Sequence, residues 1–303
     1  MTASSKQQSH SSSARSEPRL LLLIPAFNEE DRIGPVLTSY AQYLRKHYRG
    51  KWKILVVLNG CVDRTAEVVE EVKKRFSEID YLDIKERIGK GGALIEGLKH
   101  RKGFDLVGYV DADGATPPHA FLDLVRRLNG YDCVIGSRWL PDSKVIIPQT
   151  PMRRFFSRAF HLLVEILFCL GIKDTQCGAK VIRTEAIDRI FPALTITDMA
   201  FDINLLYSLR KAGYRILEVP TEWEDKLGSK VKFGRASFAW LCSLLRLRLI
   251  YSRFRPLLRW LRPFETWLYT KLLGSPSPLP VQEKTLLESS PPKKDTPKKK
   301  AQE

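Results

Sequence analysis

The sequence predicts an α/β fold in which a mostly parallel sheet is flanked by helices. Short apolar runs alternate with amphipathic segments through the first 110 residues, and Gly, Pro, Asn or Asp separate them. Strands that alternate with helices at this spacing are typical of consecutive βαβ units. The 303 residues are enough for one sizeable core, so we expect a single domain with appendages.

The predicted elements follow one another in a regular order. Residues 20–24 form a purely apolar strand that Pro25 ends, and a helix is expected over about residues 31–48. The same alternation then repeats along the chain. We expect further strands at 53–58, 81–84 and 106–110, and helices at about 65–76 and 89–100.

Polar side chains follow each predicted strand. They are Asn28 and Glu29 after the first, Asn59 and Asp63 after the second, Lys90 after the third, and Asp111 and Asp113 after the fourth. The carboxyl ends of parallel strands meet at one edge of the sheet, where such folds bind their ligands. The sequence has neither of the glycine patterns of dinucleotide folds and P-loops, so a composite nucleotide site is favoured.

Asp111 and Asp113 suggest a metal site. Residues two apart in an extended backbone point the same way, so these carboxylates repel unless a cation lies between them. Hard oxygen ligands suit Mg²⁺ or Mn²⁺. The alternative is a solvated Asp-Gly turn after a strand.

The charge of the chain is unusually positive. Of the formal +16, residues 1–17 carry +1 and residues 275–303 carry +2, which leaves +13 on residues 18–274. Nucleic acid, an anionic membrane and phosphorylated substrates are therefore all possible partners. The five cysteines form no CxxC pair, which favours reduced thiols in a cytosolic setting. We expect no signal peptide and no membrane-spanning helix.

A series of ordered motifs carries a family resemblance. In the first half these are Pro25-Ala-Phe-Asn-Glu29, Asn59 with Asp63-Arg-Thr65, Gly89-Lys-Gly91 and Asp111-Ala-Asp113. In the second half they are Gly136-Ser-Arg138, Asp174-Thr-Gln-Cys-Gly178, Phe201-Asp202, Glu218-Val-Pro220, Trp223 and Gly228-Ser-Lys230. Over about residues 20–232 the chain resembles family 2 glycosyltransferases with a GT-A fold, especially those that glycosylate dolichyl or polyprenyl phosphate.

The resemblance implies an inverting transfer of a hexose from a nucleotide sugar to a polyprenyl or dolichyl phosphate. Glucose from UDP-glucose is favoured, and mannose from GDP-mannose is the alternative. The implied cofactor is Mg²⁺ or Mn²⁺, held by Asp111 and Asp113. The implied nucleotide-sugar site consists of Pro25, Ala26, Asn28, Glu29, Asn59, Lys90, Asp111, Ala112 and Asp113.

The resemblance also implies an acceptor site. Arg138, Arg153, Arg154 and Lys230 would contact the acceptor phosphate, with Arg158 nearby, and the catalytic set would be Asp113, Asp202, Arg138, Asp174 and Gln176. Asp202 is the candidate base, although a phosphate acceptor that is mostly dianionic at neutral pH needs none. The sequence departs from the family pattern at Asn59, Ala115 and Asn204.

Simpler interpretations stand beside these assignments. Asn28 could cap the first helix with Glu29 in its first turn, Lys90 could be a solvated lysine, and Asp202 could be a helix N-terminal charge. A glycan or glycolipid hydroxyl could be the acceptor. A non-catalytic basic binding module is a third possibility, although buried parallel strands cannot offer RNA an aromatic sheet face, so no nucleic-acid partner is expected.

The chain divides into four predicted segments. Residues 1–17 form a disordered tail, 18–235 the catalytic domain, 236–274 basic amphipathic helices, and 275–303 a second disordered tail. The third segment mixes Arg with Trp and Leu, as helices that lie on anionic membranes do, and Pro256 and Pro263 should divide it. We therefore expect peripheral association with the cytoplasmic face of a membrane; the alternative is a helical hairpin packed on the domain.

Overall fold

A computed structural model describes residues 17–146, 151–224, 235–273 and 278–279. Its centre is a seven-stranded sheet in the order β3-β2-β1-β4-β7-β5-β8. All neighbouring strands pair in parallel except β7, which is antiparallel to both β4 and β5. The strands are β1 (Leu20–Ala26), β2 (Trp52–Asn59), β3 (Ile79–Ile84), β4 (Leu106–Tyr109), β5 (Cys133–Ser137), β7 (Lys180–Arg183) and β8 (Ile216–Pro220). A small parallel pair joins β6 (Lys144–Val145) to β9 (Glu222–Trp223).

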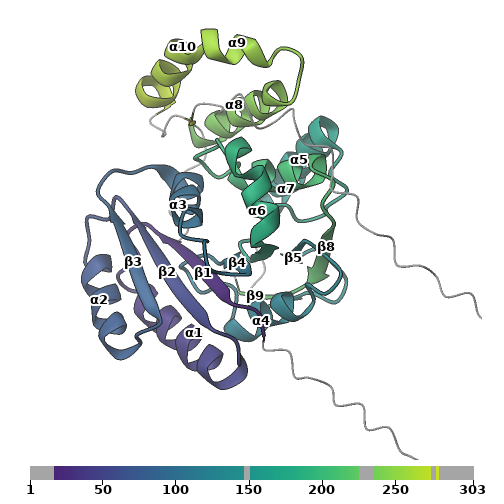
Figure 1. The fold of residues 1–303 in the computed structure, drawn as a ribbon. Helices are drawn as coiled ribbons and strands as arrows, with labels where there is room; N and C mark the ends of the chain where they lie inside the picture. Colours follow the sequence, from purple (N-terminus) through teal and green to yellow (C-terminus); the bar gives the residue numbers. More distant parts are fainter. Residues whose placement is uncertain (1–16, 147–150, 225–234, 274–277, 280–303) are drawn as a thin grey trace, which may run out of the picture.

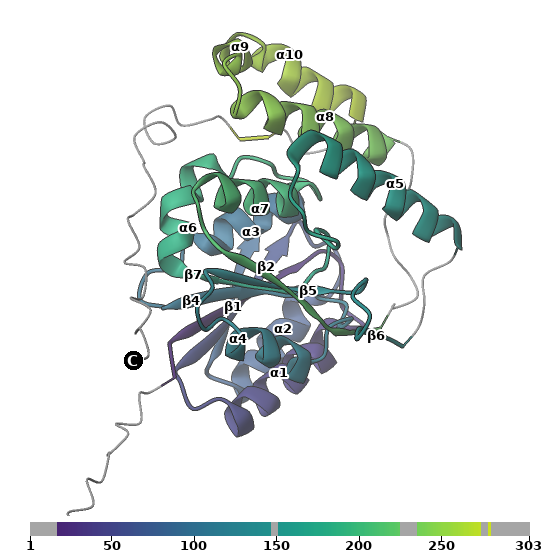
Figure 2. The same ribbon diagram turned by 90° about the vertical axis from the view of Figure 1, so that its right-hand side faces the viewer.

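Helices cover both faces of this sheet (Figure 2). One face carries α1 (Ile33–His47), α2 (Thr65–Arg75) and α4 (Pro118–Arg126). The other carries α3 (Gly89–Leu98), α6 (Thr184–Ile190), a 3₁₀ turn (Phe191–Ala193) and α7 (Phe201–Lys211). Successive leucines of β1 alternate between the two cores, because side chains alternate across a strand. The predicted mostly parallel sheet flanked by helices is confirmed.

The predicted elements agree closely with the observed ones, with two differences at the first loop. Strand β1 does not stop before Pro25 but continues to Ala26, since its pairing with β2 extends that far. Helix α1 begins at Ile33, with Arg32 as its N-terminal cap residue. The loop between β1 and α1 therefore keeps about its predicted length but lies two residues further along the chain.

A helical layer lies above the domain (Figures 1 and 2). It consists of α5 (Pro151–Phe168), α8 (Arg235–Ile250), α9 (Arg255–Trp260), α10 (Arg262–Trp267) and a π-helical turn (Leu268–Leu273). Pro256 and Pro263 each fall in the first turn of a new helix, so the predicted division at these prolines is confirmed. Within the described ranges, no helix is both long and apolar enough to cross a bilayer.

Buried polar contacts fasten this layer to the domain. Ser243 of α8 donates a hydrogen bond to Asp198 Oδ2 at 2.6 Å and contacts the Tyr269 hydroxyl at 2.8 Å. Arg246 forms an ion pair with Glu265 and donates to Thr195 Oγ1 at 2.8 Å. The segment 195–201 thus connects α8 and α10 with the core of the domain.

Only a few residues of the two predicted tails are described. Glu17 Oε2 accepts a hydrogen bond from the backbone N–H of Arg49. Leu279 donates its backbone N–H to the Thr195 carbonyl at 2.8 Å, and its own carbonyl accepts from Arg246 at 2.7 Å. The other residues predicted as tails, 1–16, 275–277 and 280–303, lie outside the described part of the chain.

Candidate active site

Two loops at the edge of the sheet are fastened to each other. Asn28 has a positive φ of 55°, a conformation that Asn tolerates better than most residues, and its Oδ1 accepts from the Val62 N–H at 2.9 Å. The Glu29 N–H donates to Thr65 Oγ1 at 2.7 Å. Asn28 therefore joins the loops after β1 and β2. The alternative that it caps α1, with Glu29 in the first turn, is wrong because α1 starts at Ile33.

Asn59 fixes the next loop along the edge. Its side chain is buried at the end of β2, and Oδ1 accepts from the Ile88 N–H at 2.8 Å. That bond holds the residues that lead into α3, whose first turn carries Lys90. In this structure Asn59 thus supports Lys90 indirectly, whatever its contact with a nucleotide.

Lys90 faces Asp111 at the centre of the edge. Its Nζ lies 2.6 Å from Asp111 Oδ1, and its side chain is only 14% exposed. Burial disfavours the ammonium, but the carboxylates of Asp111, Asp202 and Asp113 outweigh this and raise the pKa of Lys90 above its usual value. The alternative of a solvated lysine is therefore wrong.

Asp113 completes the acidic edge. Its Oδ1 accepts from the Ala115 N–H at 3.0 Å. Burial raises the pKa of Asp113, and the nearby Asp111 carboxylate raises it further. Ala115, one of the positions at which the sequence departs from the family pattern, is buried and offers no side-chain ligand.

The donor set of this edge fits a divalent cation. Its two carboxylates repel each other, and a cation between them would relieve that repulsion. Among the described residues, no cluster of three or more His, Cys, Asp or Glu side chains could hold a metal by itself. Mg²⁺ is commonly held by one or two carboxylates together with substrate phosphates and water, so Asp111 and Asp113 are sufficient protein ligands.

Asp202 lies behind the edge and is 1% exposed. Its Oδ1 accepts from Lys180 Nζ at 2.6 Å and from the Tyr109 hydroxyl at 2.5 Å. Its Oδ2 lies 3.9 Å from Lys90 Nζ and accepts no hydrogen bond from the part of the chain that the structure describes. Burial disfavours the carboxylate, but Lys180 and Lys90 outweigh this and lower the pKa of Asp202. A buried, doubly paired carboxylate is poorly placed to take a proton from an acceptor.

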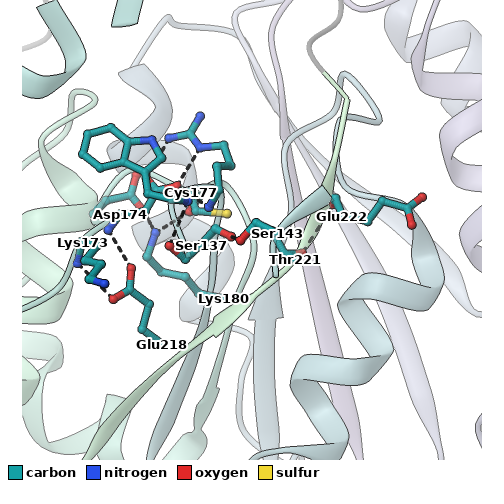
Figure 3. A network of polar contacts seen from close by, with 12 residues as sticks. Ser137, Ser143, Lys173, Asp174, Cys177, Lys180, Glu218, Thr221 and Glu222 are labelled. Atoms are coloured by element: carbon teal, nitrogen blue, oxygen red, sulfur yellow. Dashed lines mark hydrogen bonds and ion pairs between the residues drawn. The ribbon is translucent and has the colours of Figure 1, made fainter. Parts of the chain in front are cut away.

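Arg138 is bound by Asp174 rather than open to solvent. Its Nε and Nη2 donate to the two Asp174 oxygens at 2.7 and 2.8 Å, and its guanidinium lies 5.1 Å from the centre of the Trp223 ring. Burial alone would raise the pKa of Asp174, but Arg138 lowers it below its usual value. Glu218 supports the pair by accepting from the Asp174 N–H at 2.7 Å (Figure 3).

The other predicted acceptor residues are less defined. Gln176 is half-buried, and its Nε2 donates no hydrogen bond within the described structure. Arg158 is exposed on α5. Arg153 and Arg154 fall in α5, but their side chains lie outside the described structure, as does all of Lys230.

Three residues of the site had no predicted role. Lys180 is fully buried in β7 and donates to the Cys177 carbonyl at 2.6 Å (Figure 3). It also pairs with Asp202. Tyr109 holds the same carboxylate. Gly178 touches Asp111 so closely that a Cβ at this position would overlap Asp111 Oδ2. A lysine within the apolar run Ala179-Lys-Val-Ile182 was the available signal.

Comparison with solved structures supports the fold. Mannosyl-3-phosphoglycerate synthase from Rubrobacter xylanophilus aligns with a TM-score of 0.55 and 20% identity, covering 77% of this chain and 74% of that one. Glucosyl-3-phosphoglycerate synthase from Mycobacterium tuberculosis, in complex with Mn²⁺, UDP and its product, aligns with a TM-score of 0.54 and 17% identity, covering 77% and 79%. The chain therefore has the GT-A fold that the motifs implied.

Comparison with curated sequences supports the family. The chain is 35% identical over 229 residues to a dolichyl-phosphate beta-glucosyltransferase of Trichomonas vaginalis, covering 72% of this chain and 68% of that protein. The enzyme of the same name from Dictyostelium discoideum is 34% identical over 244 residues, covering 77% and 74%. The model of the glycosyl transferase family 2 matches residues 22–191. The chain thus belongs to the family 2 glycosyl transferases.

Proposed function

We propose that this protein transfers glucose from UDP-glucose to dolichyl phosphate, with inversion at the anomeric carbon, at the cytoplasmic face of a membrane. The observation that carries the proposal is the acidic edge: Asp111 and Asp113 at the end of β4, with Lys90 beside them. The relatives' printed name, dolichyl-phosphate beta-glucosyltransferase, supports the choice of sugar and acceptor. UDP-glucose carries its sugar in the α configuration, so a β product requires inversion.

The donor half of the reaction needs positive charge against a diphosphate. Asp111 and Asp113 would hold Mg²⁺ or Mn²⁺, which when bound stabilises the charge that develops on the departing nucleotide. The loops of Asn28 and Asn59 form the wall of the edge on which the nucleotide would lie. Their mutual hydrogen bonds fix this wall before the donor arrives, which lowers the cost of ordering it on binding.

The acceptor half needs no general base. A lipid monophosphate is mostly dianionic at neutral pH, by analogy with phosphorylated side chains, and one of its oxygens can attack directly. This agrees with the position of Asp202, whose carboxylate is buried behind Lys90. Arg138 would act mainly by ordering the loop after β5, since its Nε and Nη2 already donate to the Asp174 carboxylate.

The helical layer supplies a surface for the membrane. Large apolar side chains are exposed along α9 and α10 and the turn before them, namely Phe254, Leu257, Trp260, Phe264 and Trp267. Arg248 and Arg253 are exposed in the same layer. Trp beside Arg on short helices is typical of segments that lie among the headgroups of an anionic bilayer. Free cysteines among the described residues agree with a reducing compartment.

A transfer assay tests the proposal. Purified protein with dolichyl phosphate in detergent is given labelled UDP-glucose or GDP-mannose, with Mg²⁺ or Mn²⁺, and lipid-linked label is counted. We expect label from UDP-glucose, none with dolichol in place of dolichyl phosphate, and loss in Asp113→Ala. Label from GDP-mannose alone would replace glucose by mannose, and equal label with dolichol would replace the phosphate acceptor by a hydroxyl.

A further inference from the structure

Lys90 lies between two carboxylates that belong to different parts of the fold. Its Nζ is 2.6 Å from Asp111 Oδ1, at the end of β4, and 3.9 Å from Asp202 Oδ2, in the first turn of α7. Its side chain is largely buried, so the ammonium depends on protein carboxylates for neutralisation rather than on water. Only one of the two contacts is a hydrogen bond.

The two carboxylate oxygens of Asp202 differ in their hydrogen bonding. Oδ1 accepts from both Lys180 and Tyr109, whereas the buried Oδ2 accepts no hydrogen bond among the described residues. A buried carboxylate oxygen without a donor is costly, and such an atom in a folded protein calls for an explanation. The Lys90 ammonium lies 3.9 Å from this oxygen and donates its hydrogen bond elsewhere.

The Asp111 carboxylate cannot bind the Lys90 ammonium and a divalent cation equally well at the same time. Lys90 currently occupies its Oδ1, and Gly178 closes the side of Oδ2 so tightly that even a methyl group would overlap it. A cation at Asp111 would lie close to the Lys90 ammonium, which is largely buried, and the two positive charges would repel each other. This repulsion favours movement of Lys90 away from Asp111 when a cation binds.

We propose that Lys90 is a positioning residue with two alternative ion-pair partners. It binds the Asp111 carboxylate in the cation-free enzyme and moves to Asp202 Oδ2 when a divalent cation binds Asp111. This inference rests on the proposed function, because it assumes that the Asp111–Asp113 edge binds the cation. Asp202 is then the second partner of Lys90 rather than a base.

The charges of the site agree with this exchange. Asp111, Asp113 and Asp202 provide three carboxylates, and Lys90 and Lys180 provide two ammonium groups, which leaves the site one negative charge in excess when all are ionised. A cation and the donor diphosphate then enter a site whose own ion pairs are preserved, because Lys90 exchanges one carboxylate for another.

The movement is small and confined to a side chain. From 3.9 Å, Nζ needs to shift by about 1 Å to reach hydrogen-bonding distance of Oδ2. The backbone beside it is held, because a Cβ on Gly91 would lie 2.5 Å from the Ile196 carbonyl and Gly92 donates its N–H to Thr197. Four side-chain rotations are available to the lysine itself.

A double-mutant cycle on Mn²⁺ affinity tests the exchange. Wild type, Lys90→Met, Asp202→Asn and the double variant are titrated with MnCl₂ without nucleotide, and bound Mn²⁺ is measured by electron paramagnetic resonance. We expect at least tenfold tighter binding in Lys90→Met and about tenfold weaker binding in Asp202→Asn. In the Lys90→Met background, the effect of Asp202→Asn should fall below about threefold, because there is then no Lys90 ammonium for Asp202 to bind.

The control is Lys99→Met, which removes an exposed lysine just beyond the same helix and should leave Mn²⁺ affinity unchanged. Additive effects of the two substitutions would mean that the Asp202 carboxylate affects Mn²⁺ affinity only through its electrostatic field. That result would overturn the exchange. Absence of Mn²⁺ binding by wild type, even with UDP, would overturn the proposed cation site itself, a separate failure.

A second measurement applies if Asp202→Asn does not fold. In wild-type protein with ¹³C-labelled lysine, Mg²⁺ should shift the Lys90 Cε resonance, assigned by its loss in Lys90→Met, while that of Lys99 stays in place. An unchanged Lys90 resonance at saturating Mg²⁺ would overturn the exchange.

Discussion

Arg138 and Asp174 form a buried ion pair, and this decides what a substitution does. Their side chains are 12% and 2% exposed, so removal of Arg138 leaves a carboxylate with little access to water. We expect Arg138→Ala to lower the free energy of unfolding by about 3–5 kcal/mol, measured by urea denaturation. Arg127→Ala, which breaks an exposed pair with Asp123, should cost less than ~1 kcal/mol. Similar small losses in both variants would mean that the Arg138 pair is not a buried structural contact.

Asp113 should destabilise the cation-free protein at neutral pH. Burial, with Asp111 beside it, raises its pKa above the unfolded value. The folded protein therefore holds this proton more tightly than the unfolded chain does. The free energy of unfolding falls as the pH rises through the raised pKa, because the buried carboxyl must then ionise. We expect Asp113→Asn without divalent cation to melt above wild type at pH 7.5, with the difference vanishing near pH 4. Scanning calorimetry with chelator measures this, and a lower melting temperature of the variant at pH 7.5 would contradict it.

At this scale the sequence predicted the members of the site better than their contacts. The strand pattern brought Lys90, Asp111 and Asp113 to one edge, because parallel strands share an end. It could not pair Asp202 with Lys180, since that contact requires β7 to run antiparallel beside β4, and no local pattern encodes the direction of a strand.

The segment 195–201 is the element that joins the helical layer to the active site. On one side Asp198 accepts from Ser243 of α8, and on the other Thr197 accepts from the Gly92 N–H, two residues from Lys90. Burial raises the pKa of Asp198, and the hydroxyl of Ser243 opposes that shift. The geometry around Lys90 therefore depends in part on how α8 packs against the segment 195–201.

We expect Ser243→Ala to loosen this junction. The substitution leaves Asp198 Oδ2 without that donor, at a cost of about 1–3 kcal/mol. Hydrogen exchange should become faster at residues 195–201 and in α8. Thr270→Ala is the control, because Thr270 is exposed and its hydroxyl donates to the Thr266 carbonyl one turn earlier. Unchanged exchange at 195–201 would show that the contact does not hold the segment.

At the scale of elements, hydrophobic periodicity and prolines were sufficient for the strands, the first helices and the division at Pro256 and Pro263. They were insufficient for the segment 195–201, which has no periodic pattern and takes its shape from side chains outside it, Asn204 in the following helix and Arg246 in α8. The start of α1 was predicted two residues too early, and Asn28 makes a tertiary contact instead of capping the helix.

Over the whole molecule, exposed large apolar side chains are concentrated in the helical layer. Those outside it, among the described residues, are Val62, Ile146 and Leu279, whereas the layer holds Leu162, Ile166, Phe238, Leu245, Phe254, Leu257, Trp260, Phe264 and Trp267. Such a concentration is typical of a surface that docks on another phase or partner. The mixture of Arg with Trp and Leu in residues 236–274 predicted a membrane surface, but the share of α5 in this layer emerged only from the fold.

Binding to vesicles tests this surface. We expect the protein to sediment with vesicles containing anionic lipid, more weakly as salt rises, because basic residues contribute about 1 kcal/mol each at such a surface. Trp260→Ala combined with Trp267→Ala should weaken binding at least tenfold without loss of stability, since these side chains are 80% and 52% exposed. Val62→Ala, at an exposed site elsewhere, should bind as wild type does. Equal binding by all three would place the membrane contact on another surface.

We propose that the acidic edge of Asp111 and Asp113 moves glucose onto a lipid phosphate. The most direct test is to isolate the lipid product formed from UDP-glucose and dolichyl phosphate, and to determine its mass and anomeric configuration by mass spectrometry and NMR. We expect a single glucose joined through phosphate in the β configuration, formed by wild type and Lys99→Met but not by Asp113→Ala. An α-linked product, a sugar joined to a hydroxyl, or full activity of Asp113→Ala would contradict it.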